Sequence, residues 1–79
     1  MDVHPAARQN GMRDEDILRA ATDYAIAYPV DQVGPPRELR LSFDGNGRLV
    51  EVVVLLLDGG RDLAIHAMKA RRQYIELLP

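Results

Sequence analysis

Apolar and polar residues near the N-terminus follow a helical pattern. Residues 4–11 predict a short helix, because Pro5 suits a first helical position and Gly11 suits the left-handed residue after a helix end. Asp14 then looks like the N-cap of a second helix, which is expected to stop near Ala27. The apolar positions at helical spacing in this second helix are Ile17, Ala21, Tyr24 and Tyr28.

The second half of the chain alternates with a period of two, which is typical of strands. Residues 39–43 alternate, a hairpin signal follows at 44–47, and residues 48–57 are nearly all apolar, as in a central strand. Residues 63–68 predict a third strand and residues 70–78 a closing helix, while the proline-rich segment 29–36 predicts a loop. The expected fold is therefore α+β, with two N-terminal helices, a three-stranded antiparallel β-meander and a short C-terminal helix.

Strand parity assigns side chains to the two faces of this sheet. The dry face carries Val50, Val52, Val54 and Leu56 and is expected to pack on the second helix through Ile17, Ala21 and Tyr24. The other face mixes apolar and polar groups and is expected to hold Arg40, Ser42, Glu51, His66 and Met68, with Leu63 and Ile65 turned to the core. A lone acid in an apolar strand needs a partner, so Glu51 is predicted to pair with Arg40.

Length and composition indicate a small globular protein. The chain has 79 residues, which allows one domain spanning 1–79, and its 47% hydrophobic content argues against disorder. Without cysteine, a signal-peptide pattern or an apolar run long enough to cross a membrane, the chain is expected to be cytoplasmic. The formal net charge of −2 means that any binding of phosphates depends on a local basic patch.

The candidate catalytic residues lie in one cluster near the end of the chain. His66 is followed by Lys69, Arg71, Arg72 and Tyr74, which places a group able to transfer a proton beside several cations. Metal-free RNA cleavage needs that combination, although a hydrogen-bonded histidine next to a solvated basic helix start gives the same pattern. No HExxH or paired-histidine spacing is present, so neither a metal site nor a cofactor is predicted.

Four segments of the chain together match the pattern of a known family. They are Ala7-Arg8-Gln9-Asn10-Gly11, Asp14-Glu15-Asp16-Ile17, the strand from Gly47 to Val53, and Ile65-His66-Ala67-Met68 with Arg71, Arg72 and Tyr74. Through these segments the chain resembles the BrnT-like toxins of the RelE/ParE toxin–antitoxin superfamily. The resemblance implies a RelE-like fold and an mRNA endoribonuclease. It also implies a cognate antitoxin as partner, with mRNA or the ribosome as target. Gln9 and Asn10 stand where similar sequences carry basic and imidazole groups, which removes one candidate catalytic base.

Three hypotheses follow. In the first, the protein is the toxin of a bacterial type II pair, with catalytic residues His66, Arg71 and Tyr74 and RNA-binding residues Arg8, Arg40, Lys69 and Arg72. In the second, it is a non-catalytic protein-binding module that keeps the toxin fold, with Val53, Leu55 and Met68 as its partner surface. In the third, it is a small regulatory domain that shares only the architecture. A homo-oligomer is compatible with each of them.

Overall fold

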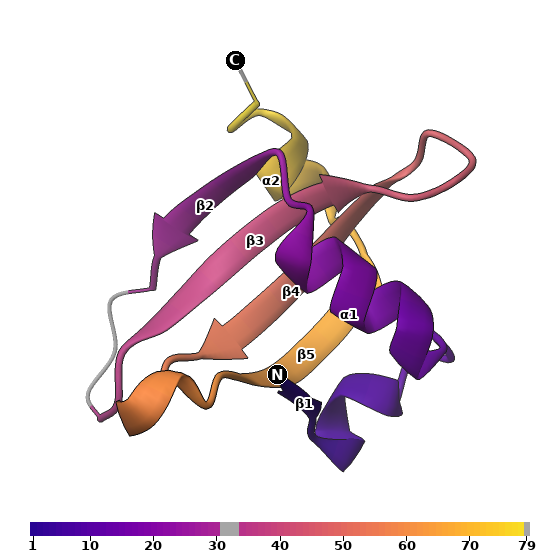
Figure 1. The fold of residues 1–79 in the computed structure, drawn as a ribbon. Helices are drawn as coiled ribbons and strands as arrows, with labels where there is room; N and C mark the ends of the chain where they lie inside the picture. The colour runs from indigo at the N-terminus through magenta and orange to yellow at the C-terminus, as the bar shows by residue number, and fades with distance from the viewer. Residues whose placement is uncertain (31–33, 79) are drawn as a thin grey trace.

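The computed structural model describes residues 1–30 and 34–78 (Figure 1). Its elements in chain order are β1 (Asp2–Val3), η1 (Pro5–Arg8), α1 (Asp14–Thr22), β2 (Ile26–Pro29), β3 (Arg37–Phe43), β4 (Leu49–Leu55), η2 (Asp58–Gly60), β5 (Leu63–Lys69) and α2 (Arg72–Ile75). The strands form one sheet in the order β1-β5-β4-β3-β2, antiparallel except for the parallel pair β1–β5. Helix α1 covers one face of this sheet, and α2 lies on the opposite side.

The predicted arrangement of two N-terminal helices, a three-stranded meander and a closing helix is therefore wrong, and so is the RelE-like fold. The protein is α+β, but it has a five-stranded mixed sheet and one main helix. The first predicted helix is a single 3-10 turn, and the predicted closing helix shrinks to the four residues of α2. Of the predicted loop 29–36, Pro29 belongs to β2, and residues 31–33 lie outside the described residues.

The second predicted helix ends five residues early because a strand replaces its last turn. Helix α1 stops at Thr22, and β2 then pairs with β3. The helical spacing predicted from the sequence includes Tyr28, but in β2 Tyr28 lies two residues from Ile26 and faces the same way, as alternate residues of a strand do. Backbone pairing with β3 satisfies the amides of this segment and decides in favour of the strand.

The core lies between α1 and the sheet. Its buried members are Ala7, Ile17, Ala20, Ala21, Val50, Val52, Val54, Ala64 and Ala67, with Leu56 packed against them and partly buried. The predicted dry face of the central strand and its contact with Ile17 and Ala21 are thus confirmed. Tyr24 does not join this core, because it follows the helix and is 42% exposed.

Two register details set the composition of the other face, called here the open face. Arg40 pairs with Val52 and Ser42 with Val50, so both point to the side of α1, and their predicted place on the mixed face is wrong. On β5 the ladder shifts: His66 pairs with Val53 and Ala64 with Val54, which leaves Ile65 as an extra residue. This β-bulge turns Ala64 into the core and lets Ile65 and His66 both border the open face.

Candidate functional site

Glu51 is the centre of the polar structure on the open face. It lies in the middle of β4, is 0% exposed, and has Leu41 and Met68 as its neighbours across the sheet. A buried carboxylate needs hydrogen-bond donors, and Arg71 supplies three. The backbone N–H and Nε of Arg71 donate to Oε1 at 2.9 and 3.1 Å, and its Nη2 donates to Oε2 at 2.9 Å. The predicted pair Glu51–Arg40 is therefore wrong.

The chain places Arg71 there through a short connection after β5. The Ala70 N–H donates to the Leu49 carbonyl, which ties the chain to β4, and Arg71 follows in an extended conformation just before α2. Burial raises the pKa of Glu51, but the hydrogen bonds from Arg71 and His66 outweigh it and hold this pKa below its usual range. The same contacts raise the pKa of Arg71. The site therefore holds a fixed charged pair.

His66 is the second partner of this carboxylate. Its Nε2 lies 2.9 Å from Oε2 of Glu51, and its side chain is 32% exposed. Because an ionised carboxylate only accepts hydrogen bonds, Nε2 carries the hydrogen, and Nδ1 is the lone-pair nitrogen of the neutral ring. Among the described residues no hydrogen bond to Nδ1 is found. Glu51 thus orients the ring and leaves one nitrogen available as a proton acceptor.

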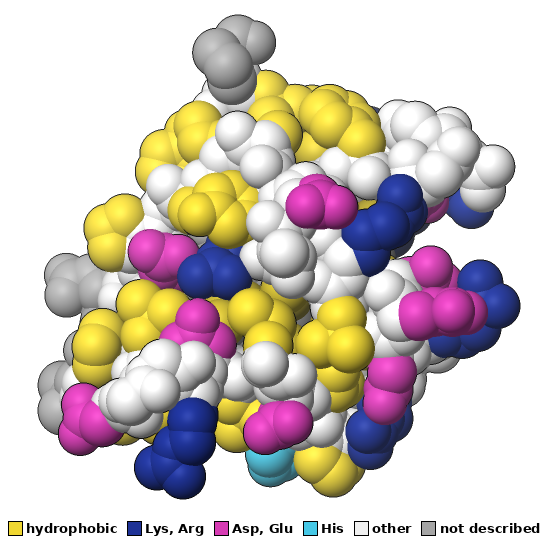
Figure 2. All heavy atoms as spheres, viewed as in Figure 1, with side chains coloured by type: hydrophobic (Ala, Val, Ile, Leu, Met, Phe, Trp, Pro, Cys, Tyr) yellow, Lys and Arg dark blue, Asp and Glu magenta, His cyan; other side chains and the backbone are white. Residues whose placement is uncertain are grey.

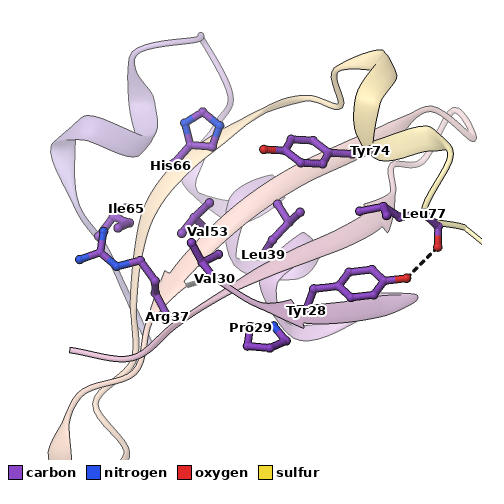
Figure 3. A pocket seen from close by; sticks show the side chains of 10 residues that line it. All are labelled: Tyr28, Pro29, Val30, Arg37, Leu39, Val53, Ile65, His66, Tyr74 and Leu77. Atoms are coloured by element: carbon purple, nitrogen blue, oxygen red, sulfur yellow. Dashed lines mark hydrogen bonds between the residues drawn. The ribbon is translucent and has the colours of Figure 1, made fainter. Parts of the chain in front are cut away.

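Tyr74 completes the cluster from α2. Arg71 Nη2 donates to the Tyr74 hydroxyl at 3.2 Å, and the guanidinium carbon lies 5.2 Å from the centre of the tyrosine ring. Figure 3 shows the phenol oxygen of Tyr74 directed toward the side of the pocket where His66 stands. One buried carboxylate therefore links the imidazole to the guanidinium, and the guanidinium in turn holds the phenol.

Next to this cluster the open face is hollowed. The hollow has a volume of about 570 Å³ and is lined by Tyr28, Pro29, Val30, Arg37, Leu39, Val53, Ile65, His66, Tyr74 and Leu77. Leu39 and Val53 form its floor, Arg37 and His66 stand on one side, and the two tyrosine rings stand on the other (Figure 3). The Tyr28 hydroxyl donates to the Leu77 carbonyl at 2.7 Å, so the C-terminal segment is held at the edge of the hollow.

The structure brings together the three predicted catalytic residues, His66, Arg71 and Tyr74. It does not gather the predicted RNA-binding residues with them. Arg8 pairs with Asp14 through two contacts of 2.8 Å, which raises the pKa of Arg8 and lowers that of Asp14. Lys69 pairs with Val50 in the sheet and so lies on the face of α1. Arg72 is exposed at the start of α2, beside Arg71 in the chain.

Arg40, the fourth predicted RNA-binding residue, is structural. Its Nη1 donates to the Ala21 carbonyl in the last turn of α1 at 2.8 Å, and its Nε donates to Glu38 at 3.1 Å. Its guanidinium also stacks on Tyr24 at 4.9 Å from the ring centre. On the face seen in Figure 2 basic side chains are interspersed with acidic ones rather than gathered in a patch. The side of the sheet on which α1 lies therefore shows no basic patch.

Two polar residues that line the hollow, Arg37 and Tyr28, are not among the predicted site residues. The helical spacing includes Tyr28, and Arg37 lies at the start of a strand with no pattern to single it out. The sequence did indicate that Glu51 has a partner, because a lone acid within an apolar strand needs one. It did not indicate which of the basic residues pairs with Glu51.

Comparisons with known proteins add no family. No protein-family model matches the chain, and no curated protein or solved structure matches it.

Within residues 1–30 and 34–78 no cluster of three or more histidine or acidic side chains is placed to hold a metal ion. In the same part of the chain no helix has the length and apolar character needed to cross a membrane.

Proposed function

We propose that this protein is an endoribonuclease that cleaves RNA through attack of the ribose 2′-hydroxyl on the adjacent phosphate. The observation that carries the proposal is that one buried carboxylate, Glu51, binds both His66 and Arg71. This arrangement fixes a proton acceptor beside a cation, as a phosphoryl transfer requires. Tyr74, hydrogen-bonded to Arg71, adds a proton donor.

In the proposed reaction His66 accepts the proton of the 2′-hydroxyl through Nδ1. The 2′-oxygen forms a bond to phosphorus, the bond from phosphorus to the 5′-oxygen breaks, and Tyr74 gives its phenol proton to that leaving oxygen. The products are a 2′,3′-cyclic phosphate and a 5′-hydroxyl, and no water is consumed. Glu51 stabilises the imidazolium that forms, and Arg71 stabilises the phenolate, before the proton returns from His66 to Tyr74. Glu51 and Arg71 are positioning residues in this scheme.

We further propose that this activity belongs to the toxin of a bacterial type II pair, which acts on mRNA in the cytoplasm and is neutralised by a cognate antitoxin. The support for this part is the resemblance of the sequence to BrnT-like toxins, carried by the segments around Arg8, Asp14 and His66. The fold adds no support, because it differs from the RelE-like fold that the resemblance implied.

The test is cleavage of an end-labelled RNA by wild type, His66→Ala and a matched control, Arg19→Ala. Arg19 is an exposed arginine on α1, on the other side of the sheet. We expect His66→Ala to lower the rate by a factor of about 10² to 10⁴ and Arg19→Ala to leave it unchanged. A substrate with a single 2′-deoxyribose at the cut position should resist cleavage. Wild type that cleaves no RNA, with or without ribosomes, would refute the proposal.

A second candidate function is a protein-binding module for the same antitoxin. It is favoured by two observations: Arg8, Arg40 and Lys69 do not converge on the site, and the hollow beside it is mostly apolar. Purified antitoxin should then bind with the same affinity to wild type and His66→Ala and should shift the amide resonances of Leu39 and Val53. Binding without any RNA cleavage would favour this candidate over the first.

A further inference from the structure

Apolar, aromatic and basic side chains line the hollow on the open face. Its floor is apolar, two tyrosine rings from distant parts of the chain flank it, and its charged or ionisable side chains are Arg37 and His66 together with the two phenols. Among the residues that the structure describes, 1–30 and 34–78, no acidic side chain lines it. Its volume of about 570 Å³ lies within the range of roughly 300–1,000 Å³ that is typical of small-ligand sites.

We infer that this hollow is a nucleobase subsite that selects guanine next to the cleaved phosphate, with Arg37 as the specificity-determining residue; this presupposes the ribonuclease function proposed above. His66 belongs both to the hollow and to the cluster built on Glu51. A base seated in the hollow would therefore hold its own ribose and phosphate near the proton acceptor.

The flanking rings point to a flat aromatic ligand. Single-stranded RNA is bound chiefly by stacking of unpaired bases on aromatic side chains. Tyr28 and Tyr74 present such rings on the same side of the hollow, and Leu39 and Val53 offer an apolar surface below them (Figure 3). The hydroxyl groups of both tyrosines are engaged with Leu77 and Arg71, which holds the rings in place.

Arg37 points to a base with two adjacent acceptors. Its Nε is buried and has no hydrogen-bond partner in the part of the chain that the structure describes. An unpaired buried donor is unfavourable, so a ligand that supplies an acceptor gains affinity there. Guanine is the base whose O6 and N7 match the guanidinium fork. Reading cytosine through its amino group needs an acidic side chain, and none of the described residues that line the hollow is acidic.

The first experiment measures binding of free nucleosides, which carry no phosphate, to ¹⁵N-labelled wild-type protein by NMR titration. We expect guanosine to shift the amide resonances of Leu39, Val53 and Ile65 and to bind about tenfold more tightly than cytidine or uridine, as one bidentate contact predicts. Equal binding of all four nucleosides would overturn guanine selection. No shift of these amides by any of the four nucleosides would overturn the base subsite.

Variants test separately the contribution of the Tyr28 ring, the contribution of the Arg37 guanidinium and the effect of a loss of folding. Arg37→Met should abolish the preference for guanosine, while Tyr28→Ala should weaken binding of every nucleoside about tenfold. Tyr28→Phe keeps the ring and should retain binding, and Arg19→Ala on α1 should behave as wild type. If Tyr28→Ala fails to fold, Tyr28→Leu provides an apolar replacement without the aromatic face. Unchanged preference in Arg37→Met would overturn its assignment.

The outcomes for this inference and for the proposed function are distinct. RNA cleavage by the wild type without nucleoside binding leaves the ribonuclease standing and overturns the base subsite. Guanosine binding without cleavage supports guanine recognition by the hollow and overturns the ribonuclease. When both are observed, cleavage of oligonucleotides with one guanosine should occur at that residue, and Arg37→Met should spread cleavage over other positions.

Discussion

Arg71 encloses the carboxylate of Glu51 with its backbone and its side chain together. The backbone N–H and Nε share Oε1, Nη2 reaches Oε2, and the guanidinium side of the pair is 49% exposed while the carboxylate is 0% exposed. The pair therefore fastens the segment after β5 to the centre of the sheet. Removing either member affects both the fold and the orientation of His66.

We predict that Glu51→Gln lowers the free energy of unfolding by about 2–4 kcal/mol, because it removes one charge of a buried pair and leaves its donors poorly matched. Urea denaturation measures this. The control is Asp16→Asn, which breaks an exposed pair with Arg13 and should change stability by only about 0–1 kcal/mol. Equal effects of the two substitutions would contradict the role assigned to Glu51.

The pH dependence of stability should report the same carboxylate. The contacts of Glu51 lower its pKa in the folded state, so the folded protein favours the charged form. Its contribution is then fully present above the unfolded pKa of about 4.3 and is lost as the pH falls through the folded pKa. The difference in unfolding free energy between wild type and Glu51→Gln should therefore shrink on acidification. A difference that grows below about pH 4 would mean a raised pKa instead.

The core prediction concerns Val52, which is 0% exposed and faces α1. Val52→Ala should lower the unfolding free energy by about 1–3 kcal/mol through lost burial and the remaining cavity. Ile75→Ala, at a side chain that is 49% exposed, should have an effect of about 0.5 kcal/mol or less. Thermal or urea unfolding compares them, and an unchanged midpoint for Val52→Ala would place the core elsewhere.

Arg40 should affect stability and not RNA binding. Arg40→Met leaves the Ala21 carbonyl without its donor and is expected to lower the unfolding free energy by about 1–3 kcal/mol. Because Arg40 is held on the face of α1, the salt dependence of RNA affinity should stay the same. Arg40→Met that folds with wild-type stability but loses RNA affinity would restore its predicted role as a phosphate ligand.

The sequence predicted the residues of the candidate site better than the arrangement of strands that holds them. His66, Arg71 and Tyr74 could be grouped because they follow one another within nine residues, so local geometry alone brings them close. Arg40 could not be placed, since the partner of a strand residue depends on register, and a shift of one residue moves a side chain to the other face. The strand β2 was missed because Tyr28 also continues the helical spacing of Ile17, Ala21 and Tyr24.

The bulge in β5 was also beyond sequence reasoning. Strict alternation would put Ala64 and His66 on one face, but Ala64 is buried in the core while His66 borders the hollow. No glycine or proline marks the bulge, because the extra residue is Ile65. Alanine at positions 64 and 67 is compatible with close packing of α1, a tertiary preference that local periodicity does not contain.

This bulge leads to the last prediction, deletion of Ile65. Removing it makes Ala64 and His66 consecutive, so alternation becomes regular with Ala64 and Ala67 still in the core and His66 still on the open face. The shortened protein should therefore fold, with a loss of about 1–2 kcal/mol for one half-buried side chain. Deletion of Ala67, from the regular part of the ladder, instead moves Met68 and Lys69 to opposite faces and should abolish cooperative folding. NMR spectra and urea unfolding of the two deletions make the comparison, and a folded Ala67 deletion beside an unfolded Ile65 deletion would show that the bulge lies at another position.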